Sequence, residues 1–173
     1  MLKEIVLIQL KLVSSFGNNY FVIFFTVLIF FLILITKKHY ISSLFLLFTN
    51  ISYPISIILK DFFKYQRPDN ASYITFLGAD KYSFPSSHVV YYTVFWGFIL
   101  YLTFKFVKDN VMIANTIRYL AIYLIIFIGS SRIILRAHYI KDVMFGYIVG
   151  ALLLIFFMLL DKKTSKMFPK YNN

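Results

Sequence analysis

Long apolar segments, separated by short polar ones, are the feature that most constrains how this chain folds. A helix that crosses the hydrocarbon core of a membrane needs ~20 predominantly apolar residues, and segments of about that length recur along the sequence. The chain is 60% hydrophobic and only 14% charged, far from the composition of a soluble globular domain. The pattern therefore predicts an all-α fold, a polytopic bundle of membrane-spanning helices.

Five membrane-spanning helices are expected. No internal repeat or linker divides them, so residues 1–173 are predicted to form a single integral-membrane domain. Pro54 is expected to kink the second helix. The five segments are, approximately, Tyr20–Ile35, Ile41–Phe63, Val89–Val107, Ile117–Leu135 and Val143–Leu160.

Residues 1–16 are too short and too charged to span, and they predict an amphipathic helix that lies at the membrane interface. A cleaved signal peptide is the alternative, but no small-residue cleavage site precedes the next apolar segment. The polar residues of the helix, which fall near one face, are Lys3, Glu4, Lys11, Ser14 and Ser15.

The basic residues determine the expected orientation and partners. The net charge is +11, from 18 Lys and Arg against 7 acidic residues, which in a membrane protein indicates cytoplasmic anchors and anionic lipid headgroups rather than nucleic acid. These residues are divided almost evenly between the two sides of the bundle. If a functional anion holds several of them on one side, the remainder favours a cytoplasmic tail at residues 161–173. The chain has no cysteine, which excludes disulfides and thiolate chemistry.

The segment from Ser131 to Asp142 carries two arginines, a histidine and an aspartate between two apolar segments. If His138 and Asp142 share a helix, their i, i+4 spacing places the imidazole and the carboxylate on one face, where the carboxylate orients the histidine. Arg132 and Arg136 are also four residues apart, and like charges at this spacing repel unless an anion lies near them. The segment predicts a phosphate site. The alternative is a cluster at the membrane surface that contacts lipid headgroups.

The loops after the second and fourth spans emerge on the same side, because successive spans cross the membrane in opposite directions. The first of these loops contains Lys60, Arg67 and His88, and the second contains Arg132 and His138. Both histidines are therefore expected on one membrane face. Most of the basic residues that are not explained as cytoplasmic anchors are expected on the same face. This coincidence favours the phosphate site.

These residues form three short motifs, namely Lys60-x6-Arg67-Pro68, Pro85-Ser86-Ser87-His88 and Ser131-Arg132-x5-His138-x3-Asp142. In order, spacing and placement relative to the spans they resemble the three signature motifs of the type 2 phosphatidic acid phosphatase family, whose members are integral-membrane lipid phosphatases. Many members have glycine where Ser87 stands. The backbone N–H at that position contacts phosphate in the family, so activity is expected to survive the change.

The compact form with five spans is most similar to the lipid A 1-phosphatase branch of that family. The resemblance implies hydrolysis of a lipid-headgroup phosphate, the 1-phosphate of lipid A, at the outer, periplasmic face of the inner membrane. Undecaprenyl pyrophosphate and phosphatidylglycerol phosphate are the alternative substrates. The resemblance implies no cofactor, no metal and no obligate protein partner; the expected partners are the lipid phosphate and the surrounding lipids.

The resemblance also implies roles for the motif residues. His138, oriented by Asp142, would attack phosphorus and form a phosphohistidine, and His88 would protonate the leaving oxygen and then activate water. Phosphoryl transfer depends mainly on positioning and on electrostatic stabilisation of the phosphate oxygens. The residues expected to bind those oxygens are Lys60, Arg67, Ser86, Ser87 and Arg132.

Each motif residue also has a purely structural interpretation. Lys60 can place its ammonium group at the end of a span, Ser86 can act as an N-cap only, and Asp142 can favour the start of the last span. Two other functions carry similar features: a vanadium haloperoxidase, which binds vanadate with the same constellation, and a lipid-binding, channel or assembly protein without activity. Basic residues outside the motifs are candidate headgroup contacts, namely Lys64, Lys81, Arg136 and Lys141.

Overall fold

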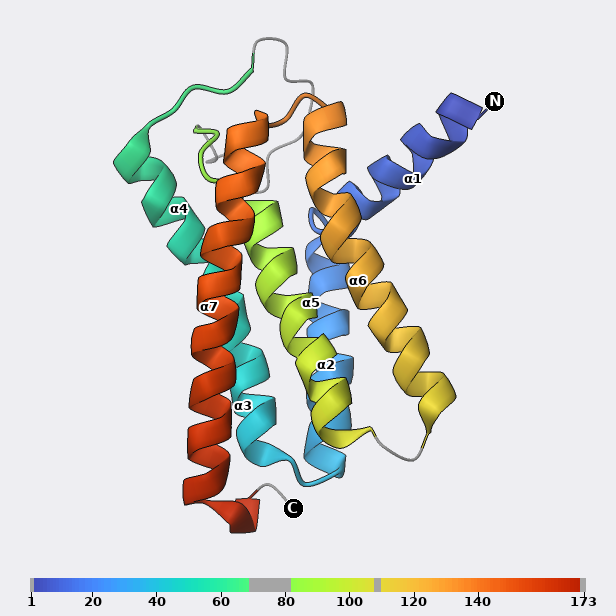
Figure 1. The fold of residues 1–173 in the computed structure, drawn as a ribbon, viewed down its shortest axis with the longest axis vertical. Coiled ribbons are helices and arrows are strands. Elements are labelled where there is room, and N and C mark those ends of the chain that lie inside the picture. Colours follow the sequence, from blue (N-terminus) through green and yellow to red (C-terminus); the bar gives the residue numbers. More distant parts are fainter. Residues whose placement is uncertain (1, 69–81, 108–109, 172–173) are drawn as a thin grey trace.

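The computed structural model describes residues 2–68, 82–107 and 110–171, and in these ranges the chain is helical, with no strand (Figure 1). The expected all-α class is therefore confirmed. In chain order the helices are α1 (Leu2–Phe16), α2 (Tyr20–Thr36), α3 (Tyr40–Phe48), η1 (Thr49–Ile51), α4 (Ser52–Phe63), α5 (Ser87–Phe106), α6 (Val111–Ile134), α7 (Ile140–Met167) and η2 (Pro169–Tyr171).

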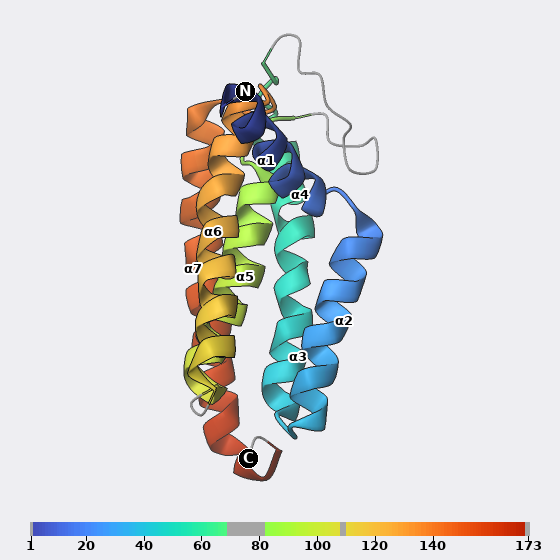
Figure 2. The same cartoon turned by 90° about the vertical axis from the view of Figure 1, so that its right-hand side faces the viewer.

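Helix α5 forms the centre of the bundle, packed mainly against α6 and α7 (Figures 1 and 2). In its most apolar window 72% of the residues are buried, against 22% in α6 and in α7, which direct most of their side chains outward. The close approach of α7 to α5 depends on glycine. A Cβ atom at Gly150 would lie 2.7 Å from Cβ of Thr93, so a larger residue there would push the helices apart.

The helices match the expected spans, with differences at their ends. The fourth begins at Val111, earlier than expected, because Asn110 accepts a hydrogen bond from the backbone N–H of Ile113 and caps the helix. Within the described ranges, a fifth span is reached only when α1 and α2, which are bent by 69°, are counted together. The four helical segments that are long and apolar enough by themselves are Tyr40–Phe63, Ser87–Phe106, Val111–Ile134 and Ile140–Met167.

The second span is interrupted by η1, just before Pro54. Proline has no N–H to donate to the carbonyl of Asn50, four residues earlier, and its ring clashes with that carbonyl. The chain therefore tightens into a 3₁₀ turn at this point. The second span is therefore irregular, as expected, but the irregular turn lies about one turn before Pro54 in the chain and not at Pro54 itself.

Helix α1 crosses the end of the bundle instead of continuing along α2 (Figure 2). It packs against α6, and the Oγ of Ser131 donates to the carbonyl of Leu10 at 2.8 Å. The sequence pattern placed Ser14 on the polar face of this helix. That placement is wrong: Ser14 is 4% exposed, because it faces the interior of the bundle and contacts Arg132 there.

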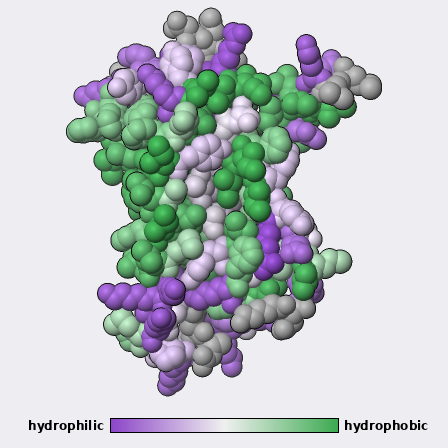
Figure 3. Space-filling view, viewed as in Figure 1, coloured by the Kyte–Doolittle hydropathy of each residue, from purple (hydrophilic) through white to green (hydrophobic). Residues whose placement is uncertain are grey.

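The opposite end of the bundle contains a buried ion pair. Asp161 is fully buried, and its carboxylate accepts hydrogen bonds from Ser42 and Tyr101, both at 2.6 Å, and from Lys105 at 2.5 Å. These contacts tie α3, α5 and α7 together. The segment expected as a basic tail therefore begins inside α7. Hydrophilic side chains gather at both ends of the molecule, with a broad apolar surface between them (Figure 3).

Candidate active site

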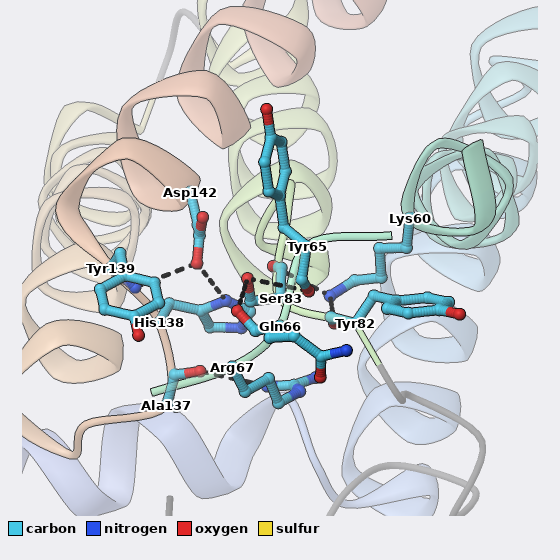
Figure 4. Close-up of polar contacts among 10 residues, drawn as sticks. All are labelled: Lys60, Tyr65, Gln66, Arg67, Tyr82, Ser83, Ala137, His138, Tyr139 and Asp142. Carbon is cyan, nitrogen blue, oxygen red and sulfur yellow. Dashed lines mark hydrogen bonds and ion pairs between the residues drawn. The ribbon is translucent and has the colours of Figure 1, made fainter. Parts of the chain in front are cut away.

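The three motifs meet at one end of the bundle, where α4 and α6 end and α5 and α7 begin (Figure 1). Figure 4 shows residues of the first and third motifs. Lys60, Arg67 and Arg132, hereafter the cation cluster, lie here. Lys60 is 2% exposed and Arg132 is 1% exposed. Arg67 is half-buried. Lysine and arginine side chains gathered at one place attract an anion and donate charge-assisted hydrogen bonds to its oxygens. The cation cluster is therefore suited to hold a phosphate group.

Local hydrogen bonds position the cation cluster. Nζ of Lys60 donates to the carbonyl oxygens of Tyr82, at 2.8 Å, and Ser83, at 3.2 Å (Figure 4). Nη1 of Arg67 donates to the carbonyl of Ala137 at 3.1 Å, next to His138 in the chain. The segments that follow α4, precede α5 and precede α7 thus converge on the same place.

His138 and Asp142 are brought together, as expected, but not by a shared helical face. His138 lies before α7, whose N-cap is Tyr139, and Asp142 occupies the third position of that helix. The carboxylate turns back: its Oδ2 accepts from the N–H of Tyr139 at 3.0 Å and lies 3.4 Å from Nδ1 of His138 (Figure 4). The carboxylate that caps α7 therefore also faces the histidine.

The surroundings of His138 favour its neutral, nucleophilic form. The ring is 3% exposed, and burial, together with the charges of the cation cluster, holds the pKa of His138 well below its usual value. Since Nδ1 faces Asp142, Nε2 is the nitrogen available to a substrate.

The second motif forms the start of α5. Ser86 is its N-cap residue, but the Ser86 side chain makes no capping hydrogen bond. The Oγ atoms of Ser86 and Ser87 are buried and have no hydrogen-bond partner among the described residues. Unsatisfied buried hydroxyls and the free N–H groups of a helix start together provide donors for an anion. The interpretation of Ser86 as an N-cap only is therefore not supported.

His88 is the second residue of α5 and is 7% exposed. It is close enough to His138 for the two rings to interact electrostatically. Its Nε2 lies 2.7 Å from Oδ1 of Asn18, in the turn between α1 and α2. The sequence analysis did not identify either Asn18 or Ser14 as a candidate site residue. Asn18 lies between the expected interfacial helix and the first expected span, and Ser14 was expected on the polar face of that helix.

Three of the four candidate headgroup contacts, Lys64, Arg136 and Lys141, are exposed at the rim of this end. Lys64 is the left-handed C-cap of α4, and Arg136 follows the end of α6 with a φ of 53°. Although Arg132 and Arg136 are four residues apart in the sequence, the Arg132 side chain is buried and the Arg136 side chain is exposed. Nζ of Lys141 lies 4.5 Å from the ring centre of Tyr65. The remaining candidate, Lys81, lies outside the described residues.

The fold and the site define a polytopic membrane protein with two buried histidines beside buried cations. A sequence model of the PAP2 superfamily matches residues 41–166, which include all three motifs. The chain belongs to the PAP2 superfamily, as the motif resemblance predicts.

Two similar proteins agree with this assignment. A crystal structure of a transmembrane PAP2-type phosphatidylglycerolphosphate phosphatase from Bacillus subtilis superposes with a TM-score of 0.75, at 23% identity, over 91% of this chain and 77% of that one. It shows that the fold is shared. A palmitoyl-protein thioesterase-dolichyl pyrophosphate phosphatase fusion from Schizosaccharomyces pombe is 30% identical over 98 residues, which are 56% of this chain. The match covers only 15% of that relative's length.

Proposed function

We propose that this protein is an integral-membrane lipid phosphatase that hydrolyses a lipid-headgroup phosphate through a phosphohistidine intermediate. The observation that carries the proposal is the convergence of His88, His138 and the cation cluster in one buried site. A protein that only bound lipid headgroups would not need a buried histidine oriented by a fully buried carboxylate.

The first step forms the phosphoenzyme. Phosphate oxygens lie against the cation cluster and the start of α5, and Nε2 of His138 attacks phosphorus. The bond from phosphorus to the lipid oxygen breaks, and His88 gives its proton to that oxygen. The phosphorylated imidazole carries a positive charge, which the Asp142 carboxylate stabilises at Nδ1.

The second step releases phosphate. His88, now neutral, takes a proton from a water molecule as the water oxygen attacks phosphorus. The P–N bond breaks, and its electron pair returns to Nε2 of His138. The protonated His88 is then ready for another substrate, and no group outside the described site is needed to balance the steps.

The cavities next to His88 support a lipid as the leaving group. A cavity of about 180 Å³ is lined by His88, Tyr91, Asn50 and Tyr20, among others. A second cavity, of about 600 Å³, shares Tyr20 and Asn50 with the first and continues along apolar residues of α2. Because His88 protonates the leaving oxygen, the lipid moiety would leave the site on this side.

The identity of the lipid is the finer part of the proposal. The first candidate is the 1-phosphate of lipid A at the periplasmic face of the inner membrane, with the end of α7 in the cytoplasm, on the resemblance to the lipid A 1-phosphatase branch. A polyprenyl pyrophosphate such as undecaprenyl pyrophosphate is the second candidate, because the fission yeast relative is named a dolichyl pyrophosphate phosphatase fusion. Phosphatidylglycerol phosphate, named in the Bacillus subtilis structure, is the third.

A substrate panel tests the proposal. Purified protein is incubated with lipid A 1-phosphate, undecaprenyl pyrophosphate and phosphatidylglycerol phosphate, and the released phosphate is measured for each. We expect turnover of at least one lipid and none by His138→Ala, and the fastest substrate identifies the lipid. Binding of these lipids without release of phosphate would support the non-enzymatic alternative, and oxidation of bromide in the presence of vanadate would support the haloperoxidase.

A further inference from the structure

The turn between α1 and α2 reaches the site from outside the region that the family model matches. The last turn of α1 and the residues that follow it, residues 13–18, are together called the elbow here, and they precede the matched residues 41–166. Nη1 of Arg132 donates to Oγ of Ser14 at 2.5 Å. The hydroxyl of Tyr92, one turn beyond His88 on α5, donates to the carbonyl of Val13 at 2.6 Å. The elbow is therefore hydrogen-bonded to Arg132 of α6 and to Tyr92 of α5.

Asn18 makes the contact that concerns the chemistry. Its Oδ1 lies 2.7 Å from Nε2 of His88, a hydrogen-bond distance. Gly17 allows the elbow to lie against the ring. A Cβ atom at Gly17 would be 3.0 Å from Cδ2 of His88 and 2.7 Å from Cε2 of Tyr92. The backbone thus brings the Asn18 amide to one edge of the imidazole.

An amide oxygen can only accept a hydrogen bond, so this contact requires a hydrogen on Nε2 of His88. In the neutral ring the lone pair is then on Nδ1, the form needed to take a proton from water. In the protonated ring both nitrogens carry hydrogen, and Nδ1 can give its proton to the leaving oxygen while Nε2 stays bonded to Asn18. One contact therefore fits both of the steps assigned to His88.

We propose that Asn18 is the positioning residue of the acid–base histidine, and this proposal rests on the phosphatase function proposed above. Asn18 orients His88 as Asp142 orients His138, with one chemical difference. Asp142 is charged and stabilises the cationic phosphohistidine, whereas the Asn18 amide is neutral and does not hold the His88 proton as a carboxylate would. A proton that must be given up in every cycle is suited to a neutral acceptor.

The test compares two leaving groups. The kcat/KM value reports the steps up to release of the leaving alcohol, in which an alkyl phosphate needs an acid and p-nitrophenyl phosphate does not. We measure kcat/KM on p-nitrophenyl phosphate and on the lipid phosphomonoester that the wild-type protein hydrolyses fastest. Asn18→Leu, which keeps the volume and loses the acceptor, should lose about tenfold or more on the lipid and much less on p-nitrophenyl phosphate. Loss of the acid–base group itself typically costs ~10²–10⁴-fold.

Two further variants separate positioning from folding. Asn18→Asp keeps an acceptor oxygen at the same place and should recover part of the kcat/KM that Asn18→Leu loses on the lipid. It should not reach the wild-type ratio of the two kcat/KM values, because the carboxylate holds the His88 proton more tightly. Asn19→Ala is the matched control: Oδ1 of Asn19 accepts from the N–H groups of Phe21 and Val22 and caps α2. Its loss should weaken the helix start and leave that ratio unchanged. In a His88→Ala background, Asn18→Leu should cause no additional loss.

Three results would overturn the proposal: an equal loss on both substrates, no recovery in Asn18→Asp, or a further loss in the His88→Ala background. If Asn18→Leu does not fold, Asn18→Ala is measured instead, and failure of both to fold would make Asn18 a structural residue and overturn the proposal. A wild-type protein without activity on any phosphate would refute the phosphatase function itself. If the wild-type protein is active and Asn18→Leu loses kcat/KM equally on both substrates, only the role of Asn18 is refuted.

Discussion

Asp142→Asn isolates the charge that faces the nucleophile. Asp142 has two roles: its Oδ2 accepts from the N–H of Tyr139 at 3.0 Å, and the same atom lies 3.4 Å from Nδ1 of His138. An asparagine amide oxygen can keep the first contact, so α7 should still begin at the same residue. Only the negative charge beside the imidazole is removed.

The expected effect on catalysis follows from the change in that contact. A hydrogen bond to a charged group contributes ~1.5–3 kcal/mol and a neutral one ~1 kcal/mol, so the charge is worth about 0.5–2 kcal/mol. The His138 ring becomes cationic as it attacks phosphorus, so this difference raises the barrier. At 1.36 kcal/mol per tenfold, kcat should fall by about 2- to 30-fold. KM should stay the same or fall, because a negative charge next to the phosphate site is removed.

The assay is steady-state hydrolysis by purified protein, with kcat expressed per folded molecule. Asp161→Asn is the matched control, since Asp161 is the other fully buried carboxylate of α7 and lies at the far end of the helix. This control removes the charge that pairs with Lys105, so it should lower thermal stability and leave kcat unchanged. A kcat of Asp142→Asn within twofold of wild type, or a raised KM with unchanged kcat, would refute the reasoning.

Four further predictions concern the histidines, the anion and the topology. His138→Ala should abolish both turnover and formation of the phosphoenzyme with any substrate. His88→Ala should accumulate acid-labile, base-stable phosphohistidine from p-nitrophenyl phosphate. A phosphorylated His138→Ala protein would mean that the nucleophile is wrongly assigned. Because burial and the cation cluster lower the pKa of His138, its ring should remain neutral as the pH falls through about 6.5. The contribution of His138 to the free energy of unfolding should be complete above that pH and be lost as the pH falls through the lower, folded-state pKa. A His138 ring that titrates near 6.5 in an NMR titration would contradict this. Activity should persist in EDTA and be inhibited competitively by orthovanadate. Loss of activity in EDTA with rescue by Mg²⁺ would argue that a metal ion, and not the cation cluster, stabilises the charge of the phosphate group. Cysteines at Lys64 and Lys166 should react with an impermeant reagent from opposite sides of the membrane, and labelling of Lys166→Cys from outside would reverse the orientation.

The amino-acid sequence by itself determined the class of fold and the set of motif residues. Apolar segments long enough to cross a membrane leave the backbone few alternatives to helices. Because successive spans alternate in direction, their order also placed His88 and His138 on the same side. Spacing within a motif is local, so pairs such as Arg132 and His138 could be recognised without knowing how the helices pack.

Only the tertiary structure decided how the site is completed. The i, i+4 spacing of His138 and Asp142 predicted the right pair for the wrong reason, because the position at which α7 begins is set by its cap. The approach of Asn18 to His88 spans 70 residues of sequence and depends on the bend between α1 and α2. Hydrophobic periodicity reports which residues avoid water, and it cannot report the angle at which one helix crosses another. A polar residue on a short amphipathic helix therefore looks like a surface residue until the packing places it against a buried cation.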